Sequence, residues 1–195
     1  MSFNNFHFHP TIQAGIGSCG YTEPTPIQKQ SIPHMLAGKD IIGIAQTGTG
    51  KTAAFVLPML QRLQQGPRNR IRGLVIAPTR ELAQQIHNNI NIMGKETGLR
   101  SAVVYGGVGR QPQLKALRTG TEIIVACPGR LLDLLNEKGI NLSSVEMLVL
   151  DEADHMFDKG FLPDLRRIIG KLPKKRQFVI YSATMPKEIE KLTQE

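Results

Sequence analysis

Six short runs of aliphatic and β-branched residues recur along the chain, each followed by a longer and more polar stretch. They span residues 41–45, 73–77, 101–105, 122–126, 145–150 and 178–181. The runs are apolar at nearly every position instead of alternating, which is typical of strands buried on both faces. Such strands belong to a parallel sheet that has helices on each side. The sequence therefore predicts an α/β fold, with one doubly wound, mostly parallel sheet.

The stretches between the runs carry the spacing of amphipathic helices. Apolar residues at 82, 86, 90 and 93 predict one helix whose stripe faces the sheet, and those at 162, 165, 169 and 172 predict another. The segment 65–72 differs from both, because it is basic and contains glycine and proline. We expect this segment to be a surface connection.

Length and composition indicate one folded domain with a basic surface. The 195 residues include 24 Lys and Arg against 16 Asp and Glu, a net charge of +8. This excess favours a polyanionic partner. No apolar run reaches the roughly 18 residues that span a bilayer, and residues 1–10 lack the features of a signal peptide. We therefore expect a cytoplasmic protein without a membrane partner.

Cysteine and histidine give no sign of a structural metal or a disulfide. Cys19 and Cys127 stand apart, in no C-x-x-C pair, so two reduced thiols are expected. His7 and His9 share a short segment with no further ligand, and a zinc site is not expected there.

A glycine-rich segment follows the first run directly and leads into a helical stretch. Its residues are Ala45, Gln46, Thr47, Gly48, Thr49, Gly50, Lys51 and Thr52. Glycines allow backbone N–H groups to turn inward, and a helix N-terminus adds positive potential. Lys51 is expected to reach the terminal phosphates of a nucleotide, and the Thr52 hydroxyl to ligate Mg²⁺. Because the usual pattern begins with glycine where this chain has Ala45, a glycine-rich strand-to-helix turn is the alternative.

Carboxylates follow the fifth run, in the segment Asp151-Glu152-Ala153-Asp154. The carboxyl ends of parallel strands share one edge of the sheet, so this segment should lie near the phosphate loop. We expect Asp151 to hold Mg²⁺ and Glu152 to orient and polarise the attacking water. The alternative is a helix N-terminus whose acids complement the helix dipole.

Together these segments make the chain resemble the first RecA-like domain of the DEAD-box RNA helicases, over nearly its whole length. In order it carries GYTEPTPIQ at 20–28, AQTGTGKT at 45–52, PTRELA at 78–83, GG at 106–107, PGR at 128–130, DEAD at 151–154 and SAT at 182–184. The resemblance implies a single RecA-like P-loop domain over residues 1–195, with a Q motif region at 3–28 and the second RecA-like domain absent from the chain.

The resemblance also implies an adenine pocket formed by Phe3, Tyr21, Glu23 and Gln28. A glutamine amide can donate and accept at once against adenine N6 and N7, so Gln28 is expected to select ATP over GTP. Phe3 would stack on the adenine. Alternatively, Phe3 plugs a groove near the N-terminus, where Phe6 and Phe8 are close competitors.

RNA contact is implied for the segments that follow the second, third and fourth runs. The residues concerned are Pro78, Thr79, Arg80, Gly106, Gly107, Pro128, Gly129 and Arg130. Backbone N–H groups and guanidinium groups there can grip phosphates, which carries no base information. For each arginine the alternative is a surface ion pair. The family usually has threonine where this chain has Cys127, whose thiol is a weak donor.

Asp154, Ser182 and Thr184 are implied to couple the nucleotide state to unwinding, through hydrogen bonds between SAT and the acidic tetrad. An ordinary helix N-cap before Pro186 is the alternative.

The resemblance thus implies the ATP-binding half of an ATP-dependent RNA helicase, with ATP and Mg²⁺ as cofactors. Its partners would be RNA and a second RecA-like domain, and the chain itself is expected to be monomeric and weakly active or inactive in hydrolysis. Two alternatives are a non-catalytic, nucleotide-responsive RNA-binding module and a P-loop phosphotransferase of the kinase type.

Overall fold

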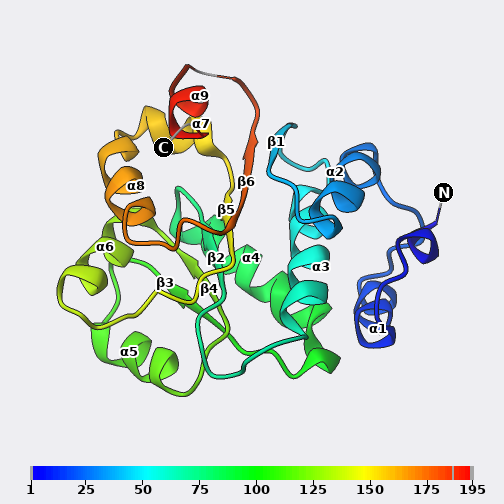
Figure 1. Cartoon of the computed structure of the whole chain (residues 1–195), viewed down its shortest axis with the longest axis horizontal. Helices are drawn as coiled ribbons and strands as arrows, with labels where there is room; N and C mark the ends of the chain where they lie inside the picture. Colours follow the sequence, from blue (N-terminus) through cyan, green and yellow to red (C-terminus); the bar gives the residue numbers. More distant parts are fainter. Residues whose placement is uncertain (1, 186, 194–195) are drawn as a thin grey trace.

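The computed structural model describes residues 2–185 and 187–193, and a six-stranded sheet forms its centre (Figure 1). The strands are β1 (Ile41–Ile44), β2 (Gly73–Ile76), β3 (Ser101–Val104), β4 (Ile123–Ala126), β5 (Met147–Leu150) and β6 (Gln177–Ser182). Neighbouring strands pair in parallel, in the order β1-β6-β5-β2-β4-β3. The parallel sheet predicted from the six apolar runs is confirmed, and each strand begins within two residues of its run.

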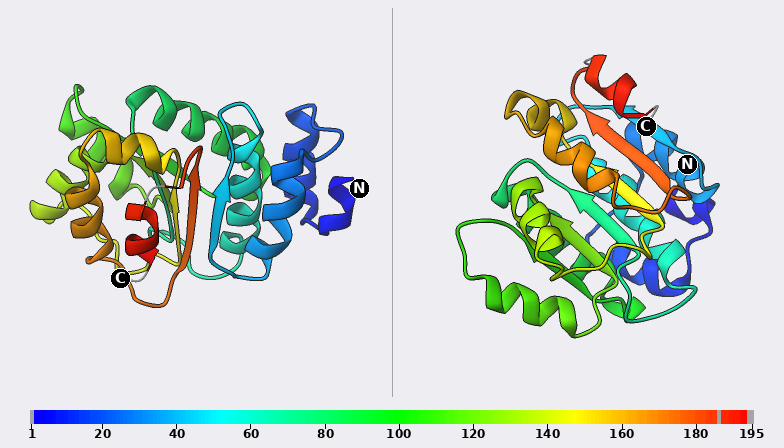
Figure 2. Two further views of the ribbon diagram at one scale, coloured as in Figure 1. Left: turned by 90° about the horizontal axis from the view of Figure 1, so that it is seen from above. Right: turned by 60° about the vertical axis from the view of Figure 1, so that its left-hand side comes forward.

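Helices cover both faces of the sheet, and two separate apolar clusters fill the space beneath them. On one side lie η1 (Phe3–Phe6), α1 (Pro10–Ser18), α2 (Pro26–Leu36), α3 (Lys51–Leu63), α4 (Arg80–Met93) and η2 (Lys95–Thr97). On the other lie α5 (Arg110–Arg118), α6 (Pro128–Asn136), α7 (Ala153–Asp158), α8 (Leu162–Ile169) and α9 (Lys187–Thr193). Figures 1 and 2 show α2 and α3 on one side of the strands and α6 and α8 on the other.

The strands serve both clusters because their side chains alternate between the faces. Val75 and Val149 enter the first cluster, whereas Leu74 and Leu148 enter the second, and all four are fully buried. Burial of one such side chain contributes about 1.5–3 kcal/mol. Strands apolar at every position are thus explained by helices on both faces.

The two helical stripes lie where the spacing predicts them, with small shifts. On α4, Ile86, Ile90 and Met93 are buried and Leu82 is partly buried. On α8 the buried residues include Leu165 and Ile169, and position 172 lies beyond the end of the helix although its side chain is buried. No helix among residues 2–185 and 187–193 is long and apolar enough to cross a membrane.

The basic segment 65–72 differs from the expectation at its last residue. Residues 65–70 are exposed, but the side chain of Arg72 is only 3% exposed. Its guanidinium donates to the carbonyl oxygens of Leu63 (2.9 Å) and Gln65 (2.6 Å), at the end of α3, and to that of Pro67 (3.3 Å). Its Nε lies 2.6 Å from a Glu146 carboxylate oxygen. Arg72 is therefore an internal cap for α3 and not part of a solvated connection.

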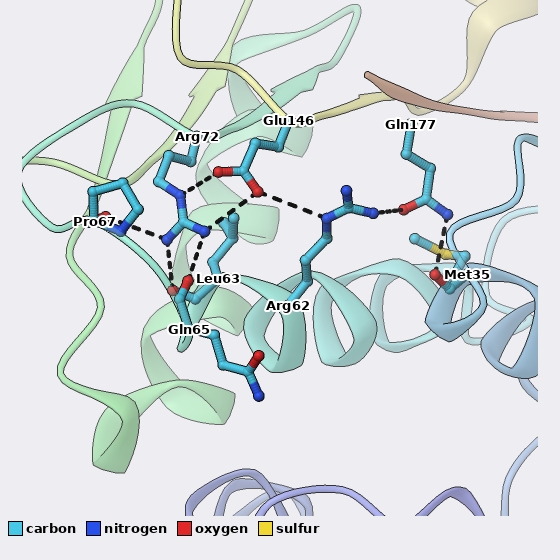
Figure 3. Close-up of polar contacts among 8 residues, drawn as sticks. All are labelled: Met35, Arg62, Leu63, Gln65, Pro67, Arg72, Glu146 and Gln177. Carbon is cyan, nitrogen blue, oxygen red and sulfur yellow. Dashed lines mark hydrogen bonds and ion pairs between the residues drawn. The ribbon is translucent and has the colours of Figure 1, made fainter. Parts of the chain in front are cut away.

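Glu146 extends this cluster toward β6 (Figure 3). Its carboxylate lies 3.7 Å from Nε of Arg62, whose Nη1 donates to the Gln177 side-chain oxygen at 3.3 Å. The Gln177 amide donates in turn to the Met35 carbonyl at 3.1 Å. These contacts join the amino ends of β5 and β6 to the carboxyl ends of α2 and α3. They fix the two helices at the end of the sheet opposite the glycine-rich segment.

Candidate functional site

Six of the seven motif segments follow strands, all except residues 20–28, so the parallel sheet brings these six to one edge. The strand order then divides that edge into two halves. The segments predicted to bind nucleotide or to couple its state to unwinding follow β1, β5 and β6, which are neighbours. The segments predicted to touch RNA follow β2, β4 and β3, which are also neighbours.

The phosphate loop runs from the end of β1 into α3. Gly48 (φ 84°) and Gly50 (φ 90°) adopt the left-handed conformation that glycine favours. Lys51 is the first residue of α3, is only 6% exposed, and donates from Nζ to the Ala45 carbonyl at 3.0 Å. No side chain caps the start of α3. The first N–H groups of the helix are thus available to an anion.

Gln28 connects the Q motif region to this loop. Its side-chain oxygen accepts from the Thr25 N–H at 2.9 Å, and its Nε2 donates to the Gly50 carbonyl at 3.0 Å. A Cβ at position 50 would lie 2.6 Å from that nitrogen, so only glycine allows the approach. The amide keeps one hydrogen and one lone pair beyond these bonds. Adenine selection by Gln28 stays a prediction, and the contact with the loop is a second role that the sequence pattern did not indicate.

The N-terminal aromatic residues pack against one another. Phe3 is 5% exposed and stacks on Tyr21, with ring centroids 6.2 Å apart and an interplanar angle of 20°. Its ring also meets Phe6 edge-on, at 6.1 Å. Phe3 belongs to the first apolar cluster, as its groove-plugging alternative expects, while Tyr21 and Glu23 are exposed. Stacking of Phe3 on adenine is not tested by this arrangement.

A pocket lies between the start of α2 and the phosphate loop. Its walls come from both segments and from the end of β1, and the residues that line it are Thr25, Pro26, Ile27, Gln30, Ile44, Ala45, Gly48 and Thr49. It combines apolar walls with a few polar groups, as ligand pockets do.

Asp151 meets the loop although β6 separates its strand from β1. It is 2% exposed, and burial raises its pKa from 3.8 to about 6, against the opposing effect of the Lys51 charge. One of its oxygens accepts from the Glu152 N–H at 3.0 Å. Lys51 and Asp151, the two residues expected to face a magnesium-bound triphosphate, therefore lie close together on one edge of the sheet.

Glu152 is held by contacts on both carboxylate oxygens. Oε1 accepts from the Thr47 hydroxyl in the phosphate loop at 3.1 Å, and Oε2 lies 3.2 Å from Nδ1 of His155. The backbone of Glu152 is left-handed (φ 53°, ψ 51°), a conformation that costs a non-glycine residue on the order of 1 kcal/mol or more. Sequence reasoning did not anticipate the contact with His155, which follows from i, i+3 spacing at the start of α7.

Asp154 bonds to the segment after β6, as the sequence predicts. Its Oδ2 accepts from the Ala183 N–H at 3.2 Å and from the Thr184 hydroxyl at 3.3 Å, and its own N–H donates to the Ser182 hydroxyl at 3.3 Å. Burial raises the pKa of Asp154, but hydrogen bonds to its carboxylate, led by the one with the Ser182 side chain, lower the pKa below its ordinary value. Pro186, on which the N-cap alternative depends, lies outside the described residues.

The other half of the edge presents two arginines beside glycine backbone. Arg80 is exposed and lies over the ring of Tyr105, 4.9 Å from its centroid. Arg130 donates from Nη1 to the Val108 carbonyl at 3.2 Å. Neither contact is the surface ion pair proposed as the alternative, because the partners are a ring and a carbonyl.

The other residues that are predicted to contact RNA lie in the backbone segments near these two arginines. Thr79 caps α4 by accepting from the Leu82 N–H at 3.2 Å. Gly106 and Gly107 are exposed, whereas Pro78 and Pro128 are buried. Cys127 occupies the N-cap position of α6 without a side-chain hydrogen bond, and burial, followed by the charge of Glu81, raises its pKa to about 11.

Comparison with known protein families agrees with this geometry. A family model described as DEAD/DEAH box helicase matches residues 25–192. The chain belongs to the DEAD/DEAH box helicase family. The predicted resemblance to DEAD-box helicases is thereby confirmed.

Individual DEAD-box relatives align with nearly the whole chain. The chain is 47% identical, over 98% of its length, to DEAD-box ATP-dependent RNA helicase CshA of Streptococcus pneumoniae, of which the match covers 36%. It is 48% identical over its full length to DEAD-box ATP-dependent RNA helicase 24 of Oryza sativa, covering 26% of that protein. ATP-dependent RNA helicase DBP3 of Meyerozyma guilliermondii is 46% identical over 88% of the chain, with 32% of that relative covered. The chain thus spans about a quarter to a third of these relatives.

Proposed function

We propose that this chain is the ATP-binding half of an ATP-dependent RNA helicase. It holds adenine nucleotide with Mg²⁺ at the β1-β6-β5 half of the sheet edge and the RNA backbone at the β2-β4-β3 half. The observation that carries the proposal is the division of one edge into these two neighbouring sets of segments. The hydrogen bonds that Ala183 and Thr184 donate to Asp154 support a coupling of the nucleotide state to unwinding.

The nucleotide half has the groups that a triphosphate requires. Lys51 and the uncapped first turn of α3 supply positive charge and N–H donors. The Asp151 carboxylate and the Thr52 hydroxyl are hard oxygen ligands of the kind that Mg²⁺ prefers. A divalent cation also suits Asp151 because burial disfavours its charge. When bound, Mg²⁺ neutralises charge on the phosphates.

Glu152 is proposed to orient and polarise the attacking water. Its carboxylate is 16% exposed and is fixed by Thr47 from the phosphate loop and His155 from α7. The contact with Thr47 ties the general base to the same loop that holds the phosphates, so water and phosphate would be positioned by one unit.

RNA is proposed to bind through its backbone, by Arg80, Arg130 and the N–H groups near Gly106 and Gly129. Such contacts are independent of base sequence, and discrimination against DNA would depend on 2′-hydroxyl groups. A second RecA-like domain is proposed to complete both sites. A monomeric state and a cytoplasmic location stay predictions. The family match gives no support to the kinase-type alternative.

Nucleotide binding tests the proposal directly. Lys51→Ala is expected to weaken binding of a fluorescent ATP analogue with Mg²⁺ by about tenfold or more, since hydrogen bonds to charged groups contribute about 1.5–3 kcal/mol. Lys174→Ala is the matched control, because Lys174 is exposed and precedes β6, at the opposite edge. Equal affinity in all three proteins, or no binding of adenylates by the unmodified chain, would overturn the proposal.

Gln28→Ala tests the adenine assignment separately. If Gln28 reads the base, the variant loses more affinity for ATP than for GTP. If its contribution is only the bond to the Gly50 carbonyl, both nucleotides lose affinity equally, because that bond supports the phosphate loop and not the base. Titrations with both nucleotides separate these outcomes.

A further inference from the structure

The loop after β3 is rich in glycine yet is held at several points. It comprises residues 105–109, of which 106, 107 and 109 are glycine. Gly107 has a left-handed φ of 79°, and a Cβ there would lie 3.8 Å from Nη1 of Arg80. The Arg80 guanidinium is therefore close both to the loop backbone and to the Tyr105 ring.

Gln113 of α5 forms hydrogen bonds to both ends of this loop. Its side-chain oxygen accepts from the Tyr105 N–H at 3.1 Å, and its Nε2 donates to the carbonyls of Tyr105 (3.1 Å) and Gly109 (3.3 Å). Gln113 is 8% exposed, so these bonds are shielded from water. One side chain thus joins the two ends of a segment whose glycines would otherwise leave it flexible.

The Tyr105 ring is itself fixed. Its hydroxyl donates to the Gln84 side-chain oxygen on α4 at 3.1 Å, and its ring packs against the first apolar cluster. An exposed arginine without such a support samples many rotamers, and ordering it on binding costs entropy. A guanidinium stacked on a fixed ring is already restricted before RNA arrives.

We propose that Tyr105 is a positioning residue for RNA binding, and that Gln113 fixes the loop on which this depends. Tyr105 holds the Arg80 guanidinium against the glycine loop, next to the backbone that Arg130 contacts at Val108, so both arginines face the RNA backbone together. This inference rests on the proposed RNA contact of Arg80 and adds to it two residues outside the family motifs.

The first experiment compares Tyr105→Leu with Tyr105→Phe. Leucine keeps apolar packing but removes the ring, whereas phenylalanine keeps the ring and loses only the hydroxyl. Anisotropy of a labelled single-stranded RNA at low ionic strength measures binding to the chain. Tyr105→Leu is expected to weaken binding about threefold, the size of an exposed cation–π contact, and Tyr105→Phe to stay within about twofold of the original. ATP affinity is the control and should not change, and thermal unfolding shows that both variants are folded at the assay temperature.

A double-mutant cycle with Arg80→Ala separates this inference from the proposed function. In the Arg80→Ala background, Tyr105→Leu should cause no further loss, because the group that it positions is gone. If Arg80→Ala alone leaves RNA binding unchanged, the proposed RNA site is wrong. If Arg80→Ala weakens binding but Tyr105→Leu does not, or if Tyr105→Leu costs as much without Arg80 as with it, only the positioning role is wrong.

Gln113→Glu tests the loop. Glutamate still accepts from the Tyr105 N–H but cannot donate to the carbonyls of Tyr105 and Gly109 when ionised. RNA binding is expected to weaken at least as much as in Tyr105→Leu, with ATP affinity unchanged. Full RNA affinity in a folded Gln113→Glu protein would overturn the role of Gln113.

Discussion

Burial of the Asp151 carboxyl group lowers the stability of the folded protein. Its pKa of about 6 is above the ordinary 3.8, chiefly because of burial. Below about pH 4 the group is protonated in both folded and unfolded chains, so it carries no penalty. Between about pH 4 and pH 6 the unfolded chain releases this proton while the folded protein still holds it, so stability falls as the pH rises, and above about pH 6 the penalty stays constant. At neutral pH this penalty is about 3 kcal/mol.

Asp151→Asn is therefore expected to stabilise the domain at about pH 8 by an amount on that order, and to give little gain near pH 4. Urea unfolding at the two pH values measures the difference. Asp158→Asn, at an exposed position of α7, is the control for the removal of one carboxylate from a site that is not buried. A stabilisation that is the same at both pH values would contradict the assigned cause.

A second prediction at the residue scale concerns Glu152 and the rate of hydrolysis. In a protein with both RecA-like domains, Glu152→Gln keeps the shape of the side chain but removes the group that polarises water. Nucleotide binding should remain within a few fold, while turnover falls about 10²–10⁴-fold, as expected for loss of a general base. Equilibrium titration and steady-state hydrolysis measure the two quantities. Unchanged turnover would show that another group activates water.

At the scale of elements, α6 begins with an unused cap. Cys127 has the extended backbone of an N-cap residue (φ −88°, ψ 142°) but makes no capping bond through its side chain. Threonine at this position would place a hydroxyl near the first N–H groups of the helix. The helix that carries Arg130 is thus less firmly anchored than α4, which Thr79 caps.

Cys127→Thr should raise the free energy of unfolding relative to Cys127→Val by about 1 kcal/mol. Valine has the shape of threonine without the oxygen, so the comparison isolates the cap. Chemical denaturation of both variants gives the difference, and equal stability would mean that the hydroxyl finds no partner there.

At the scale of the whole molecule, the two halves of the sheet edge face the same direction, because all six strands are parallel. A partner domain over that edge would contact nucleotide and RNA at once. In such enzymes, arginines from elsewhere stabilise the charge on the transferring phosphoryl group, a contribution of about 10³–10⁵ in rate.

The chain alone is accordingly expected to bind ATP but to hydrolyse it slowly, with little stimulation by RNA. Adding the second RecA-like domain, as part of a longer polypeptide, should raise turnover about 10³-fold or more. Phosphate release, measured with and without RNA for both proteins, tests this. RNA-stimulated turnover by the chain alone, at the rate of the longer protein, would contradict it.

Sequence by itself determined the strands, the helical stripes and the segments that are expected to carry the chemistry. These depend on local properties: apolar runs, 3.6-residue spacing, and glycines where the backbone must turn around phosphate. The edge shared by Lys51 and Asp151 was also predictable, since the carboxyl ends of parallel strands coincide.

Only the tertiary structure decided what depends on contacts between distant residues. The insertion of β6 between β1 and β5, the ion pair of Arg72 with Glu146, and the contact of Arg80 with Tyr105 each join segments far apart in the chain. A sequence pattern shows which faces of a helix or strand are apolar, but it does not show which other element packs against them. These contacts therefore appear only once the helices and strands are packed together.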